Sequence, residues 1–125
     1  TGLSLHLCGK STKQQRQRLL EKWYREQLHS RIPALLKHWQ PLVGRDVCEF
    51  RIKKMKTRWG TCNINARRVW LNLELINKEE KCLEYILVHE MVHLLEAGHT
   101  NTFYAHLDRL MPDWRSRDNL LKQEI

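Results

Sequence analysis

The chain has 125 residues, the size of one domain, and 42% of them are apolar. No apolar run approaches the roughly 20 residues that a membrane-spanning helix needs, so we expect no membrane partner. The four cysteines form no Cys-x-x-Cys pair, which favours buried free thiols and a cytoplasmic protein. We expect one domain over residues 1–125, and its start at Thr1 without a methionine is typical of a fragment that lacks upstream residues.

The first part of the chain predicts a short strand and then helices. Leu3, Leu5 and Leu7 alternate with other residues, as in a strand. Thr12–Gln15 has the form of a capping box and opens a stretch with apolar residues at helical spacing. Pro33 interrupts this pattern, which predicts a kink or a new helix that carries Leu35, Leu36 and Trp39. Gln40–Gly44 reads as a loop.

The middle of the chain predicts a small antiparallel sheet. Apolar and polar residues alternate with period two from Val47 to Lys53, which indicates a strand. The segment Arg58–Cys62 continues this strand or bends it at Gly60. After a turn at residues 63–67, a second alternating run from Val69 to Leu75 completes a hairpin.

The net charge of +8 is concentrated in this sheet region. Between Phe50 and Leu73 there are seven basic residues and no acidic one. A basic stripe indicates a polyanionic partner such as nucleic acid, or simply a solvated sheet face, and no recognised nucleic-acid motif decides between them. The basic residues are Arg51, Lys53, Lys54, Lys56, Arg58, Arg67 and Arg68.

The sequence His89-Glu90-Met91-Val92-His93 is typical of a metal site on a helix. Residues four apart lie one turn above each other, so both imidazoles can face one ion. Zinc accepts such nitrogens, and catalytic zinc sites use three protein ligands and a water. Glu90 would lie beside the metal, where it can take a proton from the activated water.

The residues around this motif are almost entirely apolar. From Tyr85 to Leu95 the only charged side chain is Glu90, which predicts a buried helix, capped by Asn77 and Glu80. Buried histidines and a buried carboxylate are costly unless they are paired or bind a metal. The alternative is a chance match whose histidines only form hydrogen bonds in a core.

A third ligand is expected just after this helix. His99 can fold back toward the metal if Gly98 ends the helix in the left-handed conformation, and Glu96 and His106 are the other candidates. Thr100 or Asn101 then caps a helix that ends at Pro112. A final amphipathic helix carries Trp114 and Leu121.

These motifs resemble those of a known family. The run from His89 to Arg115, with RWGTC at 58–62 and LNLELI at 71–76, resembles the YgjP-like metallopeptidases, which are related to the SprT and WLM zinc proteases. The resemblance covers roughly residues 13–121. It implies an α+β, zincin-like fold with N-terminal helices and one zinc ion per chain. It also implies His89, His93 and His99 as ligands and Glu90 as the base. Metzincins, which share the histidine spacing, have glycine at the position of Glu96, so we do not assign the chain to them.

The expected activity is therefore hydrolysis of peptide or protein substrates. Tyr104, His106 and Arg58 are candidates for stabilising the oxyanion. The resemblance also implies a strand that binds the substrate in extended form, either Leu71–Leu75 or Arg58–Cys62. The rival readings are a nucleic-acid-associated protease that acts on DNA-bound proteins, a basic binding module whose zinc is structural, and a small-molecule hydrolase.

Overall fold

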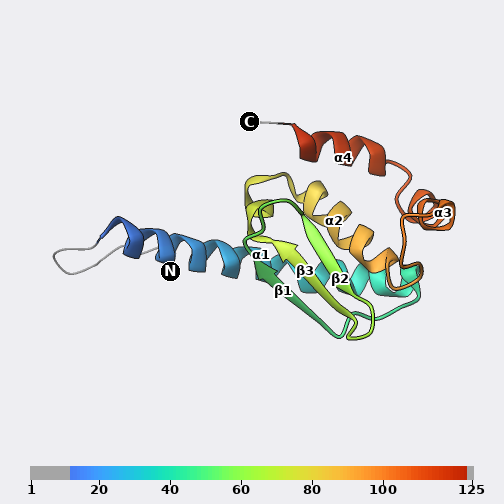
Figure 1. The fold of residues 1–125 in the computed structure, drawn as a ribbon, viewed down its shortest axis with the longest axis horizontal. Helices are drawn as coiled ribbons and strands as arrows, with labels where there is room; N and C mark the ends of the chain where they lie inside the picture. The colour runs from blue at the N-terminus through green and yellow to red at the C-terminus, as the bar shows by residue number, and fades with distance from the viewer. Residues whose placement is uncertain (1–11, 124–125) are drawn as a thin grey trace.

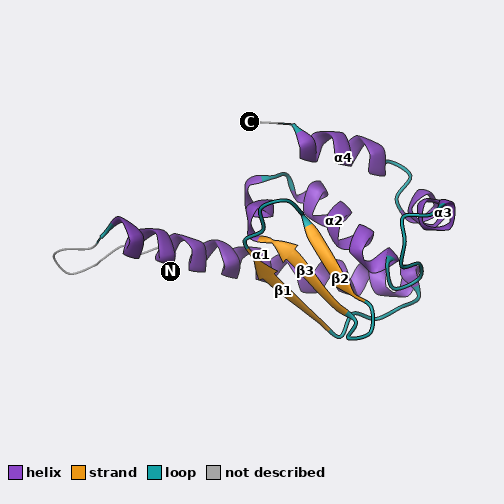
Figure 2. Cartoon of the chain, in the orientation of Figure 1, coloured by secondary structure: helices purple, strands orange, loops and turns teal. Residues whose placement is uncertain are grey.

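Helices surround one small sheet in the computed structural model, which describes residues 12–123. Figures 1 and 2 show the elements, and the α+β expectation is confirmed. The predicted strand at Leu3–Leu7 lies outside the described residues. None of the helices in residues 12–123 has both the length and the apolar character needed to cross a bilayer. In chain order the elements are α1 (Lys13–Val43), β1 (Glu49–Lys53), β2 (Gly60–Asn63), β3 (Arg68–Asn72), the 3-10 helix η1 (Leu73–Asn77), α2 (Glu80–Val92), α3 (Asn101–Leu110) and α4 (Trp114–Lys122).

Helix α1 is one continuous helix through Pro33, so of the two alternatives expected there, a kink or a new helix, the new helix is wrong. The capping box at Thr12 is confirmed, since its hydroxyl accepts from the Gln15 amide and the Gln15 side chain accepts from the Thr12 amide. Pro33 lies inside the helix and does not end it. Leu28 and Ile32 before it and Trp39 after it are all buried in the same core, which keeps the two halves of the helix in line. Packing of this kind outweighs the ~3 kcal/mol that an interior proline costs. The predicted loop at Gln40–Gly44 is also wrong, since α1 runs to Val43 and only its C-cap Gly44, which has a φ of 82°, leaves the helix.

The sheet is mixed rather than antiparallel. Its strand order is β1-β3-β2, with β1 parallel to β3 and β2 antiparallel to it. The hairpin of β2 and β3 is as predicted, but β1 does not continue into it. Residues 54–59 instead carry the chain across the end of β3, so Gly60 begins a new strand instead of bending an old one. β2 is therefore an edge of the sheet.

The alternating leucines after β3 do not extend the strand. Asn72 ends β3, and its side-chain oxygen accepts from the Glu74 amide at 3.0 Å, which starts η1. Leu73 and Leu75 are buried, but from a 3-10 helix and not from the predicted strand. The expected cap of α2 is also wrong: Glu79 is the N-cap residue, without a side-chain bond, and Asn77 donates to Glu74.

Helix α2 is the centre of the molecule. Figure 1 shows it behind the sheet beside α1, with α3 and α4 on its other side. Nine of its thirteen residues are buried, Glu90 among them. Thr100 caps α3 through the Phe103 amide, α3 ends before Pro112, and α4 follows with Leu121 buried, all as predicted. Helix α2, which carries the HExxH residues, therefore packs against the sheet and α1 on one side and against α3 and α4 on the other.

Candidate metal centre

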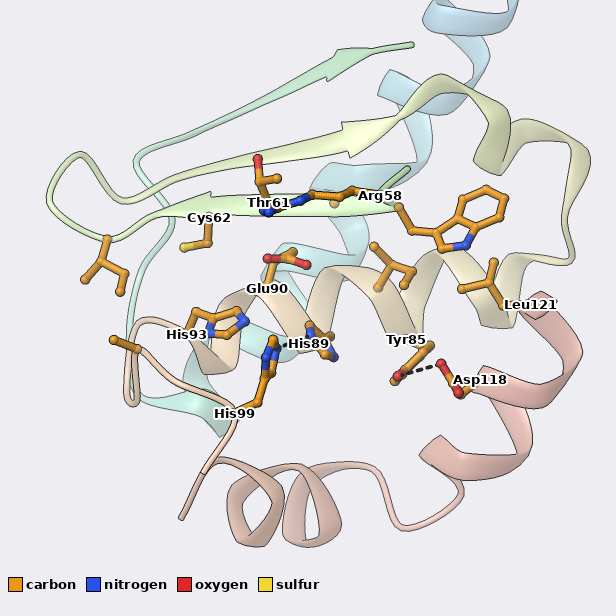
Figure 3. A pocket seen from close by; sticks show the side chains of 15 residues that line it. Arg58, Thr61, Cys62, Tyr85, His89, Glu90, His93, His99, Asp118 and Leu121 are labelled. Atoms are coloured by element: carbon orange, nitrogen blue, oxygen red, sulfur yellow. Dashed lines mark hydrogen bonds between the residues drawn. The ribbon is translucent and has the colours of Figure 1, made fainter. Parts of the chain in front are cut away.

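The three histidines lie together at the end of α2. Each histidine offers one ring nitrogen to the cluster, and these nitrogens of His89, His93 and His99 all lie within 4.8 Å of one another. Nε2 of His89 is 3.2 Å from Nε2 of His99. A tetrahedral zinc ion with nitrogens at about 2.0–2.1 Å separates its ligands by about 3.3 Å. Figure 3 shows the three rings gathered below Glu90. The donor set and its spacing fit a metal ion.

The protonation of His89 and His93 also suits metal binding, which needs neutral imidazole. Burial, with the neighbouring histidines His93 and His99, lowers the pKa of His89 to about 4. Burial likewise lowers the pKa of His93. Nδ1 of His93 lies 3.2 Å from the Glu96 carbonyl oxygen, so it donates there and leaves Nε2 free for an ion. Among residues 12–123, no acceptor reaches the buried Nδ1 of His89.

Glu90 is buried directly beside this cluster. Only 6% of its surface is exposed, and burial raises its pKa to about 8, against the opposing charge of Arg58. The backbone of β2 lies against it: a Cβ built on Gly60 would be 3.0 Å from Glu90 Cγ and 3.0 Å from Ile86 Cγ2. Only glycine allows the edge strand to approach the helix so closely. The carboxylate is therefore enclosed between α2 and β2.

The chain reaches His99 by a different route from the one expected. Helix α2 ends at Val92, and the amides of Leu94 and Leu95 bond to carbonyls three residues back, a tight 3-10 turn. Gly98 does not have a positive φ, so the left-handed break predicted there is wrong. Because α2 ends at Val92, the six residues 93–98 turn the chain and bring His99 back beside His89.

A cleft of about 510 Å³ opens onto the cluster. One wall comes from β2 and the residues before it, and another from α4. Two residues that line the cleft were not predicted from the sequence: Tyr85 of α2 and Asp118 of α4. The Tyr85 hydroxyl donates a hydrogen bond to the Asp118 carboxylate at 3.1 Å (Figure 3). The available signal was that Tyr85 precedes His89 by four residues and so shares its face of the helix.

The other predicted site residues separate into two groups. Arg58 lines the cleft with Glu90. Tyr104 and His106 do not contribute to the cleft lining. The ring of Tyr104 packs beside His99, with centroids 6.3 Å apart, and His106 lies 3.4 Å from Arg109.

The predicted basic stripe is partly engaged within the protein. Glu49 pairs with both Arg51 and Arg68, and Lys54 lies 3.8 Å from Glu21. Lys53 lies 4.6 Å from the ring centre of Trp70. Lys56 belongs to the loop after β1 and Arg67 to the β2–β3 turn, where its φ is 50°.

The cysteines in residues 12–123 are free thiols in different surroundings. Cys82 is buried as expected, but Cys48 is exposed, so the expectation of four buried thiols is wrong. Cys62 lines the cleft, where burial and the Glu90 carboxylate raise its pKa to about 11.

A helix with HExxH residues packed below the edge strand of a small sheet defines the zincin-like class of metallopeptidases. The chain belongs to the YgjP-like metallopeptidase domain family, whose family model matches residues 1–124. It is therefore a metal-dependent peptidase by family.

The solved structures with a similar fold include two metallopeptidase zymogens. Abylysin of Pyrococcus abyssi has a TM-score of 0.65 and 22% identity, over 72% of this chain and 90% of that chain. Jannalysin of Methanocaldococcus jannaschii has a TM-score of 0.61 and 18% identity, over 72% of this chain and 92% of that chain. The comparison with curated protein sequences gave no match.

Proposed function

We propose that the protein is a zinc peptidase in which His89, His93 and His99 bind the ion. The observation that carries this proposal is the convergence of three imidazoles beside one buried carboxylate, at the floor of an open cleft. A bound zinc ion would lower the pKa of a water molecule toward about 7 and polarise the scissile carbonyl. Three protein ligands leave a coordination position for that chemistry.

Glu90 acts as the general base. Its carboxylate accepts the proton of the attacking water and later delivers it to the leaving amine. A pKa near neutrality serves both transfers, and burial raises the pKa of Glu90 toward this range from an ordinary value of 4.5. A nearby divalent cation would favour the ionised form. This role also argues against a purely structural metal site, which needs no buried base.

Arg58 is the residue we propose for contact with the substrate carbonyl oxygen. It lines the cleft, and its charge acts on the pKa of Glu90, so the guanidinium lies close to the reacting groups. A fixed cation stabilises negative charge that develops on the carbonyl oxygen in the transition state. Tyr104 and His106 lie outside the cleft lining and are less suited to this role.

The substrate is proposed to bind as an extended peptide along β2. This strand is an edge of the sheet, and Gly60, Thr61 and Cys62 line the cleft. An edge strand has free backbone groups that can pair with a peptide. β3 has a partner on each side, so the alternative strand Leu71–Leu75 has no free edge for this purpose.

The first test combines metal content and cleavage. Wild-type protein should hold about one zinc ion per chain, measured by mass spectrometry of the metal after dialysis. His99→Ala should lose most of this zinc. Glu90→Gln should retain it and lose hydrolysis of a denatured protein substrate by at least about a thousandfold, as removal of a general base and its charge predicts.

Glu96→Gln is the matched control, because Glu96 contacts His93 through its backbone carbonyl rather than its carboxylate. It should keep both zinc and activity. A wild-type protein without metal after zinc addition, or a Glu90→Gln variant as active as wild type, would contradict the proposal. We keep the cytoplasm as the proposed compartment, because Cys48, Cys62 and Cys82 are free thiols.

A further inference from the structure

A second pocket of about 350 Å³ adjoins the catalytic cleft. Arg58 and Thr61 line both cavities, so the pocket continues the cleft beyond the beginning of β2. The other lining residues come from the end of β1 and the loop after it: Lys53, Lys54, Met55 and Thr57. A substrate that leaves the β2 edge at Gly60 would meet this pocket next.

The pocket is lined to receive an anion. Three of its six lining residues are cations, two carry hydroxyl groups and none is acidic. Within residues 12–123 the acidic partner of these cations is Glu21 of α1, whose carboxylate lies 3.8 Å from Lys54 Nζ, and more than half of the Lys54 side chain is exposed. Such a surface pair contributes about 0–1 kcal/mol, so a bound carboxylate can replace it.

The loop that forms this pocket is held in a defined position. Asn72, only 3% exposed, donates from its side chain to the carbonyls of Met55 and Arg58 at 3.0 and 2.8 Å. Its backbone amide donates to the carbonyl of Trp59 at 2.9 Å. Asn72 thereby ties the loop to the end of β3, and the pocket is formed before any ligand binds.

We propose that this pocket is a subsite for an acidic side chain of the peptide substrate. The proposal rests on the proposed function, because it needs a peptide lying along β2. A peptide explains the position of the pocket at the end of that strand, and an Asp or Glu carboxylate can accept hydrogen bonds from Lys53, Lys54 and Thr57. A nucleic acid is the weaker reading, since Arg51 and Arg68, which share this sheet face with Lys53, are already paired with Glu49.

Cleavage specificity tests the subsite directly. Zinc-loaded wild-type protein is incubated with a random-sequence peptide library, and the products are read by mass spectrometry. Asp and Glu should be enriched roughly three- to tenfold at one fixed position from the cleaved bond, the effect of one or two exposed ion pairs on kcat/KM. Lys53→Gln with Lys54→Gln should abolish this enrichment, and Lys53→Glu with Lys54→Glu should shift it to Lys and Arg.

The control for these double variants reverses two charges elsewhere. Lys37→Glu with Arg45→Glu alters exposed residues of α1 and the loop after it, which line neither cavity, and should keep the acidic preference. Binding gives a second measurement that does not need turnover. A labelled Glu-containing peptide should bind zinc-loaded Glu90→Gln more tightly than its Gln counterpart, and the Lys53→Gln, Lys54→Gln changes should remove the difference.

The outcomes separate the subsite from the peptidase proposal. Cleavage without acidic preference, or equal binding of the Glu and Gln peptides, would overturn the subsite and leave the peptidase intact. Absence of cleavage by wild type, together with a preference for the Glu peptide in binding, would remove the peptidase and support the anion pocket. Binding of a 20-nucleotide thymidine strand that depends on Lys53 and Lys54, without any peptide preference, would replace the acidic peptide by nucleic acid.

Discussion

Glu90 holds a carboxylate where the fold alone would favour an apolar side chain. It is 6% exposed, and burial raises its pKa to about 8. Ionising such a group inside the metal-free protein works against folding, since the unfolded chain ionises it freely. The residue is thus kept at the expense of stability, as expected of a group that serves catalysis.

The pH dependence of this effect can be measured on metal-free protein. Because the folded pKa lies above the unfolded value of 4.5, the contribution of Glu90 to stability is fully present below about pH 4.5 and is lost as pH rises through about 8. The loss is about 1.4 kcal/mol per pH unit in this window. Glu90→Gln stays neutral, so its advantage over wild type should grow to roughly 3–5 kcal/mol at pH 8. Urea unfolding at pH 5, 6.5 and 8 with a chelator present gives this difference.

Glu96→Gln serves as the control here too, because this side chain is not buried and the variant should keep the pH dependence of wild type. The low pKa of His89 affects wild type and Glu90→Gln alike and cancels in their difference. An advantage of Glu90→Gln that is the same at all three pH values would show that Glu90 is not buried as described.

At the site, the sequence could predict what lies on one helix but not what other elements add. The spacing of His89 and His93 places them on one face of α2 because helical geometry alone decides it. Tyr85 follows the same rule, but a tyrosine in an apolar run reads as core. Asp118 and Asn72 gave no signal, since their roles depend on contacts across 33 and 14 to 17 residues of sequence.

The approach of β2 to α2 is the feature that encloses the site at the level of elements. A Cβ at position 60 would lie 3.0 Å from Glu90 Cγ and from Ile86 Cγ2, and 3.1 Å from the carbonyl oxygen of Trp70. The carbonyl belongs to the paired strand β3 and cannot yield without disturbing the hairpin. The edge strand and Glu90, the proposed base, therefore share one close contact.

Gly60→Ala should separate β2 from α2. We expect a loss of about 1–3 kcal/mol in the free energy of unfolding, the usual cost of overpacking, and a lower kcat/KM because the proposed base Glu90 and the proposed substrate edge β2 move apart. Gly98→Ala is the matched control, since its added Cβ would meet only Thr100 Cγ2, at an ordinary 3.5 Å, and should be close to neutral. Equal effects of both substitutions in unfolding and peptidase assays would show that the close approach has no special role.

The elements that the sequence mispredicted share a cause, which is that tertiary packing overrode a local signal. Pro33 did not divide α1 because buried residues on both sides keep the helix in one core. The strand ends at Asn72 although the alternating leucines continue beyond it. A 3-10 helix can also bury Leu73 and Leu75, so their spacing does not require a strand. The parallel pairing of β1 with β3 depends on the path of residues 54–59, about which periodicity says nothing.

At the scale of the whole molecule, one carboxylate joins three helices. Glu84 of α2 accepts from Trp39 Nε1 of α1 at 2.8 Å and from Arg117 Nη1 of α4 at 2.7 Å. The Arg117 side chain is 17% exposed and that of Glu84 is 23% exposed. α4 also supplies Asp118 and Leu121 to the cleft, so this network holds one wall of the site in place.

Arg117→Met should therefore weaken the fold and the site together. Glu84 would keep a half-buried charge with only the indole as partner, for which we expect a loss of roughly 1–3 kcal/mol. Lys81→Met, which removes an exposed pair with Glu79 at 3.9 Å, should change stability by less than about 0.5 kcal/mol. Urea unfolding of Arg117→Met, Glu84→Gln and the double variant measures the coupling of the pair, expected at about 1 kcal/mol or more. Additive effects would mean that the two side chains act separately, and that α4 is held by other contacts, such as the burial of Leu121 and the hydrogen bond between Tyr85 and Asp118.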